Sequence, residues 1–226
     1  MSRFQLDYRP VLPICSAISM RFTGAFDLTI FLSMLFALLT LCSLPQEARA
    51  QGNYQNWYPR DISLPSGHSY PCALTAMPAN LDGIPAVDKA FINHVYAMLL
   101  QCVQAKTLML DTLRADNGGF SQAYSAYYAK TTQARQKIMA EPLPAGLQGF
   151  RDGVINALDQ QILFFGKASR ARTSGKSFQE VMGYSEGRNA STLLIGAWSA
   201  MSARYPGLSP AVSDSAYHHL CALDLF

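Results

Sequence analysis

Charged residues are scarce in this chain: they make up 15% of its 226 residues, and the formal net charge is only +3. No run of lysine and arginine forms a basic stripe, and no lysine at all precedes Lys89. A surface that binds nucleic acid needs such a concentration of positive charge. We therefore expect no nucleic acid among the partners of this protein.

Histidine is also rare, and His68, His94, His218 and His219 are the only four. They form no His-x3-His pair and no Glu-x-x-His pair, which are the spacings that place two metal ligands on one helix face. The Cys-x-x-Cys-His sequence that attaches haem is absent as well. We predict no metal site and no cofactor. A histidine-based metal-binding protein stays an alternative, because ligands that are distant in sequence can meet in the fold.

One long apolar run lies near the N-terminus, at residues 28–44. Ala48, Arg49 and Ala50 follow it and match the small-x-small pattern of a cleavage site. This arrangement predicts a signal peptide over residues 1–50, with Met20 as an alternative start. Cleavage after Ala50 would leave a periplasmic or secreted protein without a stable membrane span. The alternative is an uncleaved helix that anchors the protein in a membrane.

Few cysteines remain after that cleavage, namely Cys72, Cys102 and Cys221. An oxidising compartment permits a disulfide among them. We predict one disulfide that involves Cys72, and the sequence leaves its partner open. Cys102 also belongs to an apolar stripe, so a buried free thiol is its alternative state.

The mature chain divides at about residue 85 into an irregular segment and a helical domain. Residues 51–84 contain Pro59, Pro65, Pro71 and Pro78. Proline at this density excludes helix interiors and disfavours central strands. We expect residues 51–84 to be an irregular segment packed on the bundle formed by residues 85–226.

Apolar residues recur at helical spacing through the second part. Steps of four and three residues predict helices over residues 85–117, 120–140, 145–171 and 178–204, and a shorter one over residues 210–223. Gly183 and Gly187 are expected to kink or split the fourth helix, with Asn189 as a candidate N-cap of its second part. Short loops with glycine and proline favour antiparallel neighbours. The predicted fold is an all-α antiparallel bundle of about four longer helices, with a proline-rich irregular N-terminal segment and a short C-terminal helix.

One short motif matches a known catalytic sequence pattern: Pro65, Ser66, Gly67 and His68. It resembles the second motif of the vanadium-haloperoxidase-like acid phosphatases, in whose pattern His68 would be the proton donor. The family's first motif is missing, and Lys176 and Glu180 stand where the third requires a histidine and an aspartate. The reaction then lacks its nucleophile. The alternative interpretation is a turn, with glycine in a left-handed conformation.

No complete catalytic set appears elsewhere in the sequence, and no nucleophile elbow or phosphate-binding loop is present. We therefore expect a binding or interaction protein without catalysis of its own, such as an accessory subunit or an inhibitor-like or immunity-like factor. Its expected partner is another protein. The alternative is a hydrolase, such as a degenerate acid-phosphatase-like enzyme that uses His68.

Overall fold

The computed structural model describes residues 64–69 and 83–225, and in these ranges the chain forms six α-helices and no strand. The expected signal peptide, its alternative start at Met20 and most of the proline-rich segment lie outside the described residues. The helices are α3 (Ala86–Ala115), α4 (Phe120–Ala140), α5 (Gln148–Thr173), α6 (Phe178–Met182), α7 (Ser185–Arg204) and α8 (Pro210–Leu223). The all-α prediction is confirmed, including the short C-terminal helix.

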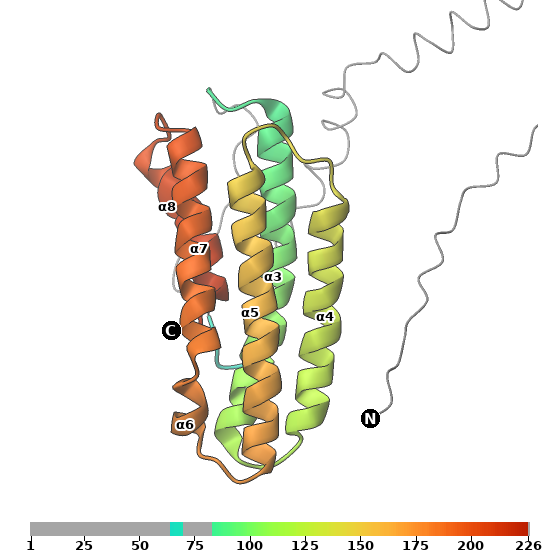
Figure 1. The fold of residues 1–226 in the computed structure, drawn as a ribbon. Helices are drawn as coiled ribbons and strands as arrows, with labels where there is room; N and C mark the ends of the chain where they lie inside the picture. Colours follow the sequence, from blue (N-terminus) through green and yellow to red (C-terminus); the bar gives the residue numbers. More distant parts are fainter. Residues whose placement is uncertain (1–63, 70–82, 226) are drawn as a thin grey trace, which may run out of the picture. The chain divides into compact units, whose positions relative to one another are not determined.

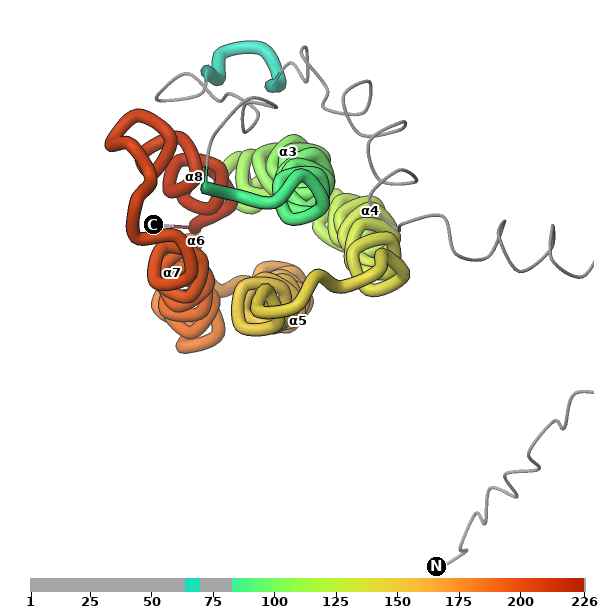
Figure 2. Tube along the Cα trace, turned by 90° about the horizontal axis from the view of Figure 1, so that it is seen from above, coloured from blue at the N-terminus to red at the C-terminus, as the bar shows by residue number. Residues whose placement is uncertain are grey.

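The long helices run antiparallel to their neighbours and form a bundle (Figure 1). Each contacts the next one in the order α3, α4, α5, α7 and α8, and α8 also contacts α3. Viewed along the bundle, these helices surround a common centre, with α8 between α7 and α3 (Figure 2). The bundle therefore consists of the four long helices α3, α4, α5 and α7, and α8 packs between α7 and α3.

The predicted apolar stripes form the core of this bundle. On α3, the side chains of Phe91, Val95, Met98, Cys102, Met109 and Leu113 are all buried. Two clusters fill the interior: one surrounds Tyr96 and Phe150, and the other surrounds Tyr127 and Phe165. Burial of these aromatic and aliphatic side chains is the main favourable contribution to the stability of the bundle.

The predicted break at Gly183 is also present. Ser177 begins α6 with a capping box: its hydroxyl accepts from the Glu180 amide, and the Glu180 carboxylate accepts from the Ser177 amide. Gly183 ends α6 after five residues, and α7 starts at Ser185. The fourth predicted helix is thus a short helix followed by a long one. The expected N-cap at Asn189 is wrong, because Tyr184 precedes α7, and Gly187 and Asn189 lie inside that helix.

Two helices approach each other very closely because of glycine. A Cβ placed on Gly153 of α5 would lie 2.9 Å from the Ala197 Cβ and 3.1 Å from the Ala197 Cα of α7. One turn earlier, a Cβ on Gly149 would lie 3.3 Å from the Ala200 Cβ. Small residues on both helices therefore set the α5–α7 distance, and a larger side chain has no space there.

The end of α8 is held by polar side chains from three helices. The Lys106 ammonium of α3 donates to the carbonyl oxygens of Ala222 and Asp224. Gln161 of α5 donates to the Leu223 carbonyl at 2.7 Å, and the Ser191 hydroxyl of α7 donates to the Asp224 carboxylate. The carbonyls at the C-terminal end of α8 are thus satisfied inside the bundle, where an unpaired carbonyl would be destabilising.

A buried histidine on α8 links the stability of the bundle to pH. His219 is fully buried and its ring stacks on Tyr96, with centroids 4.0 Å apart. Burial lowers the pKa of His219 to about 4 from its ordinary value of 6.5. The folded state therefore binds fewer protons than the unfolded state between these two pKa values, and protonation favours unfolding.

We expect the bundle to lose roughly 3 kcal/mol of stability as the pH falls from about 6.5 to about 4, and to lose no more through this group below that range. Burial lowers the pKa of His94 too, so its effect has the same sign. Urea unfolding of the wild type and of His219→Phe across this range measures the contribution. An equally steep pH dependence in both proteins would exclude His219 as its source.

Candidate functional site

A surface groove of about 670 Å³ lies between α3 and α4. Its apolar lining combines three alanines, the exposed Leu108 and two buried residues; together they are Ala105, Ala123, Ala126, Leu108, Met109 and Tyr127. Leu108 is 52% exposed at this surface and adds apolar area to the lining. Alanine at the points where α3 and α4 face each other leaves the volume that a longer side chain would fill.

The rest of the groove is lined by groups that form hydrogen bonds. Four of these groups are amide side chains from α3, the α3–α4 loop and α4: Gln101, Gln104, Asn117 and Gln122. The other two are the Thr112 hydroxyl and the Lys130 ammonium group. An amide side chain both donates and accepts, so such walls match a ligand that offers both kinds of group. The groove combines an apolar floor with polar walls, which is the usual composition of a binding site.

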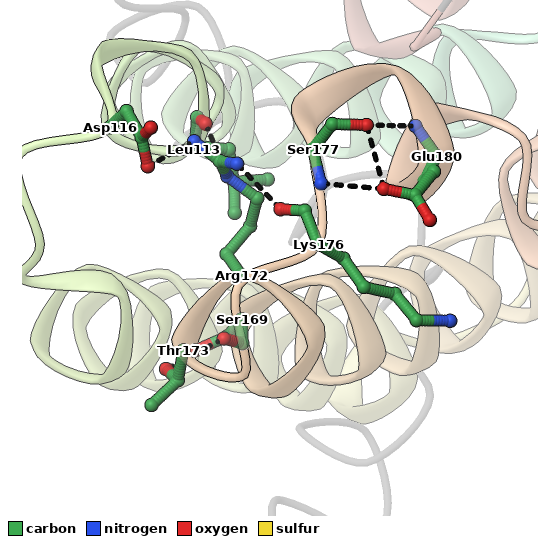
Figure 3. Close-up of polar contacts among 8 residues, drawn as sticks. All are labelled: Leu113, Asp116, Ser169, Arg172, Thr173, Lys176, Ser177 and Glu180. Carbon is green, nitrogen blue, oxygen red and sulfur yellow. Dashed lines mark hydrogen bonds and ion pairs between the residues drawn. The ribbon is translucent and has the colours of Figure 1, made fainter.

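A buried arginine fixes the loop at one end of the groove (Figure 3). The Arg172 side chain of α5 is only 5% exposed. Its guanidinium donates to the Leu113 carbonyl at 2.9 Å, to the Lys176 carbonyl at 2.6 Å and to the Asp116 carboxylate at 2.8 Å. It also lies over the Phe120 ring, 5.2 Å from its centroid.

These contacts join the end of α3, the start of α4 and the loop between α5 and α6. Asp116 caps the C-terminal end of α3 in the left-handed conformation, and Gly118 and Gly119, which line the groove, follow it. Both glycines have positive φ angles, which glycine adopts without strain. Arg172 therefore holds the tight turn that ends α3 and begins α4. The sequence interpretation missed this role, because Arg172 lies in a polar, basic stretch that is typical of an exposed loop.

His68, the catalytic candidate of the sequence, lies in a turn. Its amide donates to the Pro65 carbonyl at 3.0 Å, and Gly67 has a φ angle of 86°. Its Nε2 atom is 2.8 Å from the Asp111 carboxylate of α3, with both side chains about one-third exposed. His68 is not among the described residues that line the α3–α4 groove. The predicted turn is confirmed, and the histidine–aspartate pair fastens it to α3.

Two of the three predicted disulfide candidates are described. Cys102 is buried and Cys221 is partly exposed, and both are free thiols. Among the described cysteines, then, no disulfide forms, and Cys72 lies outside the described residues. Burial raises the pKa of the Cys102 thiol to about 12, so this group stays protonated and is a poor nucleophile. The alternative of a buried free thiol is the one that Cys102 shows.

Metal-ligating groups do not gather in the part of the chain that the structure describes. Within residues 64–69 and 83–225, no three His, Cys, Asp or Glu side chains lie close enough to hold a metal ion. Among the helices of the same ranges, none has both the length and the apolar character needed to cross a membrane. His94 is buried, with its Nε2 atom 3.7 Å from the Glu141 carboxylate, and His219 bonds within its own helix.

Comparisons of the chain with protein-family models, with curated proteins and with solved structures found no match in any of the three. The two distinguishing properties of the groove are the apolar floor around Leu108 and the amide groups on both walls.

Proposed function

We propose that this chain is an exported helical binding protein that acts without catalysis of its own, and that the α3–α4 groove holds a segment of its partner protein. The observation that supports this proposal is the groove itself, with its exposed Leu108 and its alanine floor. Apolar surface that is exposed on a water-soluble bundle and rimmed by polar groups is typical of a protein–protein contact.

The position of His68 also favours binding over hydrolysis. His68 is not among the described residues that line the groove, so it is not placed to act on a ligand held there. A general acid or base must reach the substrate that it protonates or deprotonates. In this proposal His68 anchors the turn at residues 64–69, and the groove meets the partner.

Site-specific cross-linking in the exported fraction of the source organism tests the proposal. The photoreactive residue p-benzoylphenylalanine replaces Ala126, an exposed residue of α4 that lines the groove. The matched control carries the same residue in place of Ser199, which is exposed on α7 and outside the groove lining. We expect a discrete cross-linked adduct from position 126 that is absent from position 199.

The adduct must depend on the shape of the groove. Ala105→Trp, on the opposite wall, fills part of the space and is expected to suppress the adduct from position 126 while the chain stays helical by circular dichroism. Equal adducts from positions 126 and 199, or no adduct from either, would contradict the proposal.

A further inference from the structure

The charges around the groove are unbalanced. Among the described residues that line it, Lys130 alone carries a charge, and none is acidic. The nearby carboxylates at the end of α3 are already paired: Asp111 binds His68 and lies near Arg114, and Asp116 binds Arg172. Within residues 64–69 and 83–225, no carboxylate forms an ion pair with Lys130, so this lysine presents a positive charge to a ligand in the groove.

The start of α4 adds to this positive potential. Gly119 precedes α4 and provides no side-chain cap, and the first turn of the helix contains no acidic residue. The amide groups at a helix N-terminus carry a partial positive charge. Gly119 and Gln122 line the groove at this end, whereas Lys130 lies about 15 Å further along α4 at 1.5 Å per residue. The groove thus has two separate positive sources, the start of α4 near one end and Lys130 further along the helix.

The walls also indicate the backbone conformation of the occupant. Gln101 of α3 and Gln122 of α4 offer amide groups on opposite sides. A helix has already used its backbone hydrogen bonds, whereas an extended segment has free N–H and C=O groups on both edges. The groove spans α3 from Gln101 to Thr112, which is about 17 Å. At about 3.3 Å per residue, this length accommodates about five extended residues.

We propose that the α3–α4 groove binds a short, extended and acidic peptide segment of another protein, with one of its carboxylates bound to the Lys130 ammonium. Apolar side chains of the segment pack on Leu108 and the alanine floor, and its backbone bonds to the amide walls. This inference rests on the function proposed above and adds the chemistry of the partner.

Two labelled hexapeptides test the inference by fluorescence anisotropy with the chain from residue 51 onward. One alternates glutamate with leucine, and the other has glutamine in place of each glutamate. We expect the acidic peptide to bind at least about tenfold more tightly than the neutral one, because a carboxylate on an ammonium forms a charge-assisted hydrogen bond. Added salt should reduce this difference, since it screens exposed charges.

Variants at one position separate charge from shape. Lys130→Gln is expected to weaken binding of the acidic peptide about threefold to tenfold and to leave the neutral peptide unaffected, whereas Lys130→Arg keeps the preference. Lys176→Gln is the matched control, because it removes the same charge from an exposed loop outside the groove lining. Ala126→Trp is expected to reduce binding of both peptides.

Equal binding of the two peptides, or equal effects of Lys130→Gln and Lys176→Gln, would overturn the inference. If cross-linking from position 126 still gives its adduct, the proposed function survives and only the acidic partner is rejected. Tighter binding of a single-stranded oligonucleotide or of anionic vesicles than of the acidic peptide would also reject a peptide as the occupant.

Discussion

Replacing Arg172 with methionine lowers the expected free energy of unfolding by about 2–4 kcal/mol. Methionine keeps much of the apolar volume of the arginine but donates no hydrogen bond. The carbonyls of Leu113 and Lys176 and the Asp116 carboxylate would then lose a partner that is itself buried. Leaving the carbonyl of the buried residue Leu113 unpaired is costly, because water does not reach it, whereas the exposed residues Asp116 and Lys176 can bind water instead.

The arginine is expected to be specific at this site. Arg172→Lys should recover little of the lost stability, because one ammonium group does not reproduce the fork that reaches three acceptors in different directions. Arg170→Met is the matched control, since Arg170 lies two residues earlier on α5 with an exposed side chain. Urea unfolding followed by far-UV circular dichroism compares the three variants. Equal stability of Arg172→Met and Arg170→Met would refute the role assigned to the buried guanidinium.

The second large effect is expected at the α5–α7 contact. Gly153→Ala should lower the free energy of unfolding by about 1–2 kcal/mol, although alanine is the better helix former. The added Cβ would lie 3.1 Å from the backbone Cα of Ala197, so relief requires the two helices to move apart. Gly153→Leu should prevent native packing altogether, with loss of the near-UV circular dichroism signal.

Gly196 provides the matched control for this prediction. It lies on α7, and an added Cβ there would meet nothing within 4 Å. Gly196→Ala should therefore raise the free energy of unfolding by about 0.5–1 kcal/mol through helix propensity alone. The same glycine-to-alanine substitution is thus expected to lower the free energy of unfolding at Gly153 of α5 and to raise it at Gly196 of α7. Stabilisation by Gly153→Ala would show that the α5–α7 distance relaxes easily.

The sequence predicts most of the helical framework, because apolar periodicity reports burial directly. The helix expected over residues 120–140 corresponds to α4 (Phe120–Ala140), and the one over residues 210–223 corresponds to α8 (Pro210–Leu223). In each case the spacing along one helix is enough to separate the buried face from the exposed face.

Local periodicity does not predict contacts between helices that are distant in the sequence. In the sequence, Arg172 cannot be distinguished from an arginine of an exposed loop. Its role depends on the Leu113 carbonyl near the end of α3, which is 59 residues away in sequence. In the sequence, Gly153 only indicates a position of low helix propensity. The structure shows that Ala197 of α7 packs directly against it. The groove depends in the same way on the packing of α3 against α4, which brings Ala105, Ala123 and Ala126 into one lining. The signal that could have indicated the α5–α7 contact is the four-residue spacing of Gly149 and Gly153.

The polar contacts of the last residues imply an order of folding. Lys106, Gln161 and Ser191 belong to α3, α5 and α7, so their common target can bind only when these helices have already assembled. Docking of the C-terminal residues joins positions more than 100 residues apart, as between Lys106 and Ala222. Such distant contacts form late, since their loop-closure entropy is lost before they contribute stability. We therefore expect docking of residues 222–224 to be a late step in folding, which depends on the prior assembly of α3, α5 and α7.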